Sequence, residues 1–501
     1  MSSPLLNNPL EVILQITSYL TTPEFGHLRA SCKQLEGSLS AVFAKEFFSK
    51  RQFSLTEFSI QTLLDISKSR FGPGLTHLII HLEHPASILM TVTQRQQGLT
   101  LRGHNEHVYQ YLSHSIFTST GRDLEMLSEA IQHLPNLETI GMRDFNSKRT
   151  RDLTLWHSYG SPTLNQRTSP ANLLGLPGIR RPQEFRTNEY TNHVFLAIVR
   201  AIAASAASGH NPRLTRLEVL LHRCHFSDSA FVIPPQWEDG ITLGLGKLTT
   251  ILIDGLTTLY HDRPYMQFSP SEPEPNDGYF LTRFLLKATA LEHLRLNFPT
   301  YDRAAIQHVL AWLANTSGRT SLDTTPENGL AALVRPGVLP MSYPNPPTFR
   351  NLRRIDIGMA TVKLSTLVAV YKEYKTSLRA ISLHKSNIEC GLKANVLERL
   401  CHKLVQIGVN LREFNMSYLD QHSGRIRSQV KFLNTKNNRV MSWRGTAFSQ
   451  SIADITNNIE LEPPIDGDVT MDDDDDYDDD GDDDDTDSLE SSSEQDSDDF
   501  V

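Results

Sequence analysis

The sequence has few cysteines and no long uninterrupted apolar run. Four cysteines in 501 residues are too few and too scattered for a disulfide framework, which favours a reducing compartment. The most apolar window, residues 195–208, contains Arg200 and is too short to span a bilayer. Glu11 interrupts the first apolar stretch, which argues against a signal peptide. We therefore expect a protein of the cytoplasm, the nucleus or both, without membrane contact.

Motifs of catalysis are also missing. The sequence contains no phosphate-binding Gly-rich loop, no G-x-S-x-G and no H-E-x-x-H. The run from Asp476 to Asp487 matches part of a calcium-loop pattern, but any poly-Asp run with one glycine would do so by chance. We expect no enzyme, no cofactor, no metal ion and no specific nucleic-acid ligand.

Basic residues are absent from the C-terminal end. Residues 460–501 hold 22 acidic side chains and no lysine or arginine, although the whole chain has a net charge of only −10. This leaves 36 acidic and 48 basic residues in residues 1–459, a net of +12. The sequence thus predicts a mildly basic body and, at residues 446–501, an acidic tail that self-repulsion keeps disordered.

Three short helices are predicted in the first 55 residues. Asn8 and Pro9 precede the first apolar stripe, and Thr21 with Glu24 fits a capping box before the second. The apolar residues at helical spacing are Val12, Ile13, Ile16 and Leu20, then Phe25, Leu28, Cys32 and Leu35, then Leu39, Val42, Phe43 and Phe47. A module this small is marginal alone, so part of its apolar surface should meet the rest of the chain or another protein.

This N-terminal module resembles the F-box over about a tenth of the chain. The matching residues, without a gap, are Pro9-x-Glu11, Leu14, Ile16, Leu20, the Pro23-Glu24-Phe25 turn, Leu28 and Cys32-Lys33. The resemblance implies that the helices bind a Skp-type adaptor, which in turn holds a cullin scaffold. It assigns adaptor binding to Pro9, Leu10, Glu11, Ile13, Leu14, Ile16, Leu20, Pro23, Phe25, Leu28, Cys32 and Lys33.

Three positions depart from the F-box pattern. Asn8 stands where leucine is usual, Ser31 where valine is usual and Leu35 where tryptophan is usual. Leu5 and Leu6 are expected to replace part of the apolar contact that Asn8 cannot make. The alternative interpretation is a three-helix cap on the domain that follows.

A short pattern, Leu-x-x-apolar-x-apolar, recurs eight times in residues 56–445. It begins at Leu75, Leu137, Leu214, Leu248, Leu291, Leu352, Leu378 and Leu411. Helical patterns between them lie at residues 123–134, 193–205, 279–288, 304–314, 364–374 and 395–407. Repeated strands and helices predict an α/β solenoid of short parallel strands backed by helices, and the pattern resembles an irregular leucine-rich repeat. An F-box before such a domain is the arrangement of the fungal type of F-box protein; an ordinary α/β domain is the alternative.

Alternation along each predicted strand turns the residues between the apolar positions outward. The candidates for a target-binding surface are His81, Arg143, Asp254, Arg295, Asn297, Arg354, Asp356, His384 and Asn415. The alternative is a sheet face that is only solvated. Long insertions at residues 146–191, 261–277 and 317–347 interrupt the repeats, and the first is basic enough to bind an acidic partner or the tail.

The sequence therefore predicts a non-catalytic, substrate-recognition subunit of a Skp-cullin-F-box ubiquitin ligase. Its partners would be the adaptor, the cullin scaffold through it, and a target protein that the sequence does not identify. The alternative function is a non-ligase scaffold, because repeats with an acidic tail also resemble the acidic leucine-rich nuclear phosphoproteins, which bind histones. That family lacks the N-terminal module.

Overall fold

The structure is a computed structural model in which twelve segments of the chain are described. These are residues 4–84, 101–146, 158–159, 188–209, 213–222, 224–257, 278–298, 303–315, 349–389, 395–423, 426–433 and 435–462. Most of the three predicted insertions, and the acidic residues from 463 onward, lie outside the described residues. The statements below concern the described part of the chain.

The three predicted N-terminal helices are present. They are α1 (Leu10–Thr17), α2 (Thr22–Ala30) and α3 (Lys33–Phe48), after a 3-10 turn at Pro4–Asn7. The capping box is confirmed, since the backbone N–H of Thr21 donates to Glu24 Oε2 at 2.8 Å. Asn8 and Pro9 suggest a helix capped by Asn8 with Pro9 as its first residue, but in the structure Pro9 takes the N-cap position and the Asn8 amide donates to the carbonyl of Leu5.

A ten-stranded sheet forms the body. Its strands are β1 (Lys50–Ser54), β2 (His77–His81), β3 (Thr139–Arg143), β4 (Arg216–Leu220), β6 (Thr250–Ile253), β8 (His293–Asn297), β9 (Arg354–Gly358), β11 (Ala380–His384), β13 (Glu413–Ser417) and β16 (Val440–Arg444), in that spatial order. All neighbours pair in parallel except β13 and β16, which are antiparallel. The middle eight are the eight predicted repeats, whereas β1 and β16 were not predicted.

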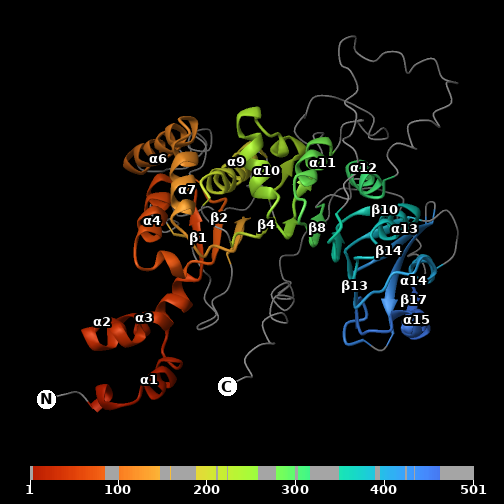
Figure 1. Ribbon diagram of the computed structural model, residues 1–501, viewed down its shortest axis with the longest axis horizontal. Helices are drawn as coiled ribbons and strands as arrows, with labels where there is room; N and C mark the ends of the chain where they lie inside the picture. The colour runs from red at the N-terminus through yellow and green to blue at the C-terminus, as the bar shows by residue number, and fades with distance from the viewer. Residues whose placement is uncertain are drawn as a thin grey trace, which may run out of the picture. The chain divides into compact units, whose positions relative to one another are not determined.

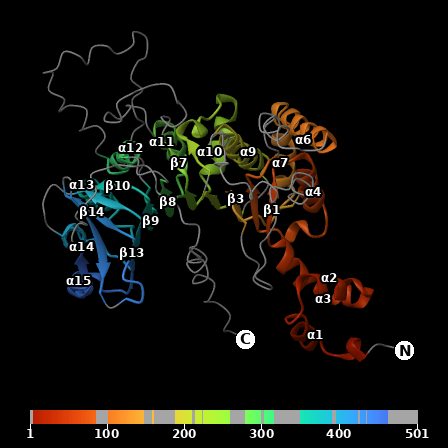
Figure 2. The ribbon, with the colours of Figure 1, turned by 180° about the vertical axis from the view of Figure 1, so that it is seen from behind.

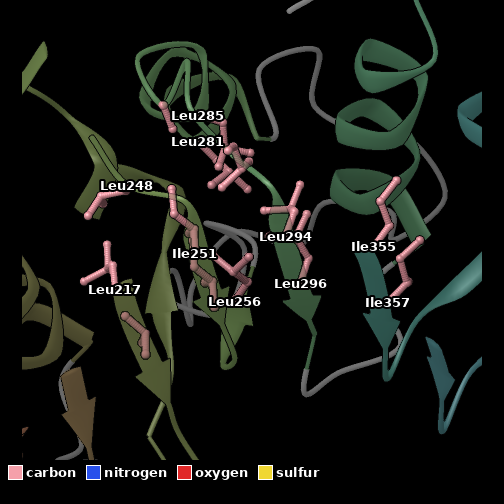
Figure 3. Packing of buried hydrophobic residues seen from close by; sticks show 14 of the residues in the cluster. Leu217, Leu248, Ile251, Leu256, Leu281, Leu285, Leu294, Leu296, Ile355 and Ile357 are labelled. Atoms are coloured by element: carbon pink, nitrogen blue, oxygen red, sulfur yellow. The ribbon is translucent and has the colours of Figure 1, made fainter. Parts of the chain in front are cut away.

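The strand register explains the apolar pattern. Equivalent residues of successive repeats lie opposite one another, as Leu217, Ile251, Leu294 and Ile355 do across four strands. Figure 3 shows this row and the next, with Leu281 and Leu285 of α11 (Tyr279–Leu286) beside the strands. These side chains are all buried in one continuous core. The repeat is therefore a unit of packing, in which each strand adds two apolar rungs to the core.

Helices lie along one side of this sheet, as the opposite views in Figures 1 and 2 show. Besides α11 they are α4 (Glu57–Lys68), α6 (Leu101–Ser119), α7 (Arg122–Gln132), α9 (Asn188–Ala207), α10 (Glu238–Leu245), α12 (Arg303–Leu313), α13 (Leu364–Glu373), α14 (Val396–Ile407) and α15 (Phe448–Asn457). The six predicted helices are confirmed as α7, α9, α11, α12, α13 and α14. The fold is thus mixed α/β with a mostly parallel sheet.

A second, smaller sheet follows the strands of the C-terminal repeats. It contains β10 (Thr361–Lys363), β12 (Asn387–Glu389), β14 (Asp420–Ser423), β15 (Ile426–Phe432) and β17 (Ile459–Leu461). A residue with positive φ precedes β10, β12 and β14 at equivalent positions, namely Met359, Lys385 and Tyr418. Gly255 holds the same conformation between β6 and β7 (Leu256–Thr257), so four repeats share one turn although the residues that make it differ.

Both predicted domain boundaries require correction. Residues 50–54 form β1 of the body sheet, so the helical module ends near Ser49 rather than at residue 55. The body extends to Glu462 rather than to residue 445, because α15 packs Phe448 against the core and β17 pairs with β15. The sequence analysis missed β1, α15 and β17 because none of the three contains the Leu-x-x-apolar-x-apolar pattern.

The described residues form two separate apolar clusters. The smaller is built from Ile13, Phe25, Leu35, Leu39 and Phe47, and Leu5 and Leu6 pack against it. The larger runs from Phe53 to Ile455. Cys32, Cys224 and Cys401 are free thiols. Within the described segments, no helix combines the length and apolar character that crossing a bilayer requires.

Candidate functional site: the N-terminal helices and the strand face

The twelve residues assigned to adaptor binding divide into three groups by exposure. Ile13 and Phe25 are buried in the module's own core and cannot contact a partner directly. Half-buried residues that pack on this core are Leu14, Leu20, Leu28 and Cys32. Exposed residues are Pro9, Leu10, Glu11, Ile16, Pro23 and Lys33. Ile13 and Phe25 therefore stabilise the fold of the module, whereas the six exposed residues are accessible to another protein.

Helix α1 exposes an apolar face. Val12 and Ile16 lie one turn apart on this helix and are 40% and 39% exposed, and Tyr19, in the turn that follows the helix, is 81% exposed. Leu10, in the first turn, is 43% exposed. Ile13 and Thr17 turn the other side of the helix into the module. The apolar residues that the sequence placed on one stripe thus lie on two faces of the helix. One face is buried inside the module, and the other is exposed.

A few contacts join the module to the start of the body. Arg29 and Arg70 both pair with Glu36, and the Phe48 and Phe71 rings stack at 4.5 Å between centroids. Helix α3 continues directly into β1. The side of the module that these contacts cover does not include the open face of α1.

The polar residues predicted on the strand face are more buried than expected. His81, Arg143, Asp254, Asn297 and Asp356 are buried, whereas Arg295, Arg354, His384 and Asn415 are half-buried. Their exposure falls because charged side chains on the same strand or on neighbouring strands pair with and cover one another. The structure brings together Asp254 with Arg295, and Arg354 with Asp356. Their role in binding a target stays a prediction.

Glu218 of β4 collects three positively charged or ionisable groups. Its carboxylate lies 2.5 Å from Arg216 Nε and 3.4 Å from both Arg143 Nη2 and His77 Nε2. Gly141 lies opposite Glu218 on the neighbouring strand. Any larger residue there would crowd Glu218, since a Cβ at this position would lie 3.0 Å from the carbonyl oxygen of Glu218. Burial opposes ionisation, but the contact with His77 and the charges of Arg216 and Arg143 together lower the pKa of the Glu218 carboxyl.

Similar groups continue toward the C-terminal strands. His293 Nε2 lies 2.7 Å from Asp356, and the Nε of Arg354 donates to the same carboxylate at 3.0 Å. Arg354 also donates to Glu413 at 3.1 Å. Burial opposes the ionisation of Asp356, yet the contacts with His293 and Arg354 lower the pKa of its carboxyl. The strand face therefore carries a row of separate charged groups: one around Glu218, one of Asp254 with Arg295, and one around Asp356.

Asp254 differs from Glu218 and Asp356 because the pKa of its carboxyl is raised rather than lowered. Arg295 donates to its Oδ2 at 2.8 Å, but its Oδ1 is buried without a hydrogen-bond partner among the described residues. Burial, reinforced by the charges of Asp356 and Glu218, raises the pKa of Asp254 to about 6 against the opposing effect of Arg295.

This raised pKa predicts a distinct pH dependence. A carboxyl with a raised folded pKa contributes stability below its unfolded pKa of 3.8 and loses that contribution as pH rises through about 6. Asp254→Asn should remove this loss, so the unfolding free energy of the wild type should fall relative to that of the variant by about 2 kcal/mol between pH 4 and pH 7. Denaturant titrations at both pH values measure this difference. Parallel pH curves for the two proteins would contradict the assignment.

Several members of the row were not predicted. Glu218, His293 and Glu413 take part in it, and each lies in a repeat at a position between the apolar residues. The pairs Arg143–Glu218 and His293–Asp356 join positions two residues apart in the strand register, so a comparison of equivalent positions in neighbouring repeats does not find them. Within the described residues, no group of three or more histidine, cysteine or acidic side chains is placed to hold a metal ion.

Comparison with known proteins adds little. No protein-family model matches the sequence, and no curated protein matches it. Among solved structures, the chain is similar to the leucine-rich repeat-containing protein LegL7 from Legionella pneumophila, with 8% identity and a TM-score of 0.25. The match covers 81% of this chain and 97% of that chain. A score at this level carries no argument, so the description of the repeat rests on the strand register of this chain.

Proposed function

We propose that this chain is a substrate-recognition subunit of a Skp-cullin-F-box ubiquitin ligase. The observation that carries the proposal is the open apolar face of α1, on a three-helix module whose residues resemble the F-box. Val12, Ile16 and Tyr19 are exposed although the module has a complete core of its own. Burial of such a face in an interface is favourable by about 25 cal/mol per Å², which supports a protein partner for it.

The work of the chain is then geometric. The N-terminal helices bind the Skp-type adaptor and, through it, the cullin scaffold. The body presents a target protein within reach of the activated ubiquitin, which another subunit carries. A long, rigid sheet of in-register strands suits this role because it holds a bound target at a fixed place.

Co-purification with a Skp-type adaptor tests the proposal. Leu10→Asp with Ile16→Asp places two charges on the open face while leaving the module core intact, so adaptor binding should fall by at least about a hundredfold. The matched control is Leu243→Asp on α10, where the leucine is 49% exposed and belongs to the body. That control should bind the adaptor as the wild type does.

Two results would count against the ligase assignment. One is adaptor binding that survives the Leu10→Asp, Ile16→Asp double change; the other is no adaptor binding by the wild type. In the second case, salt-sensitive binding to histones that disappears on deletion of residues 460–501 would favour the scaffold alternative.

A further inference from the structure

Three successive repeats carry arginine at one equivalent position. Arg353, Arg379 and Arg412 each follow the buried leucine that opens their repeat. Main-chain hydrogen bonds fix them side by side: the N–H of Arg379 donates to the carbonyl of Arg353, and that of Arg412 to the carbonyl of Arg379, both at 2.7 Å. Arg444, on the next strand, lies at the end of this row: it is opposite Glu413 in the register, and its neighbour Gly445 donates to the carbonyl of Arg412. We call these four residues the arginine row.

The charge of the arginine row is weakly neutralised. Glu292 lies 3.7 Å from Arg353, and Glu413 lies 3.9 Å from Arg444, so both distances exceed a hydrogen bond. Glu413 is also engaged by Arg354 at 3.1 Å. Among the described residues, no carboxylate reaches Arg379 or Arg412. The guanidinium of Arg379 instead donates to the carbonyls of Leu378 and Thr376.

This arrangement does not serve the fold. Neighbouring strands are about 4.8 Å apart, and equal charges at that spacing repel each other. The equivalent residues of the earlier repeats are uncharged or acidic, as Thr215, Thr249 and Glu292 show. The side chains of Arg353 and Arg444 are 66% and 55% exposed, so the charge is open to a ligand.

We propose that the arginine row binds an extended acidic segment of another protein. A row across three strand spacings measures about 15 Å, which an extended chain covers with about five residues. Carboxylates along such a segment meet planar guanidinium groups that can donate two hydrogen bonds each. The binding itself is independent of the F-box resemblance; that the segment marks a ubiquitination target rests on the proposed function.

Fluorescence anisotropy with a labelled peptide of about ten residues tests the inference on the full chain. The peptide alternates aspartate and serine, and the matched neutral peptide has asparagine in place of aspartate. The acidic peptide should bind at low salt, and Arg379→Gln with Arg412→Gln should weaken binding by at least about tenfold. Higher salt should weaken it as well. The control, Arg122→Gln with Arg283→Gln, removes the same charge from exposed sites elsewhere and should leave binding unchanged.

Several outcomes would overturn the inference. Equal binding by the Arg379→Gln, Arg412→Gln variant would remove the row from the site, and equal weakening by the control would show an effect of net charge alone. Binding of a phosphoserine–asparagine peptide without binding of the acidic peptide would replace carboxylate by phosphate as the ligand. Binding that appears only after deletion of residues 463–501 would make this chain's own acidic end the competitor and overturn the occupant proposed here.

The same proteins separate this inference from the proposed function. The arginine variant should keep adaptor binding, whereas Leu10→Asp with Ile16→Asp should keep peptide binding. The arginine variant should also melt no lower than the wild type, because it relieves repulsion within the row. A lowered melting temperature together with lost binding would attribute the loss to damaged folding and overturn the assignment.

Discussion

Replacing Phe25 with alanine is expected to unfold the N-terminal helices, abolish adaptor binding and leave the body folded. Phe25 is fully buried, and its ring lies 5.9 Å from that of Phe43 and 5.8 Å from that of Phe47. Loss of a buried phenylalanine costs about 3–5 kcal/mol. The unfolding free energy of a module of this size is too small to absorb that loss, since small domains are marginally stable. Hydrogen exchange of the segment from α1 to α3, measured beside adaptor co-purification, would show both losses together.

The body should keep its structure in this variant because its core is a separate cluster. The reciprocal control is Phe414→Ala, which removes an equally buried phenylalanine from the body sheet. It should lower the unfolding transition of the body and leave adaptor binding in place. Loss of protection throughout the chain after Phe25→Ala would instead show that the two clusters fold as one.

The repeat could be predicted from the sequence because its signal is local. Each strand needs only a leucine and two apolar residues at fixed spacing, and the same residues fill the core in register. The helices α7, α9, α11, α12, α13 and α14 were predicted for the same reason. By contrast, β1 and β16 lack the pattern, so no local signal marks them as the two edge strands of the sheet.

The candidate sites were less predictable. The motif placed Ile13, Phe25 and Ile16 in one group, but only the folded module separates the residues that fill its core from Ile16, which it exposes. Likewise, alternation predicted that Arg143 faces away from the apolar core. It could not predict its burial, because that depends on Glu218, which lies 75 residues further along the chain.

Glu218→Gln should destabilise the body by about 3–5 kcal/mol near pH 7, the usual loss when one member of a buried ion pair is removed. The change keeps the shape of the side chain but removes the charge that faces Arg143, itself only 2% exposed. Denaturant unfolding at neutral pH measures the loss. Glu129→Gln is the matched control, because Glu129 pairs with Lys68 at the surface, where both side chains are over 40% exposed; such pairs contribute about 0–1 kcal/mol.

The pH dependence of this variant should be opposite in sign to that of Asp254→Asn. A carboxyl with a lowered folded pKa contributes stability above its unfolded pKa of 4.5 and loses it as pH falls below that value. The difference in unfolding free energy between the wild type and Glu218→Gln should therefore become smaller in acid. By contrast, the unfolding free energy of the wild type should fall relative to that of Asp254→Asn as pH rises toward 7. The two buried carboxyls would then differ because of their neighbours: Glu218 pairs with two arginines, whereas the one arginine paired with Asp254 among the described residues is Arg295. If both variants shifted with pH in the same direction, the net charge of the protein would be responsible rather than these contacts.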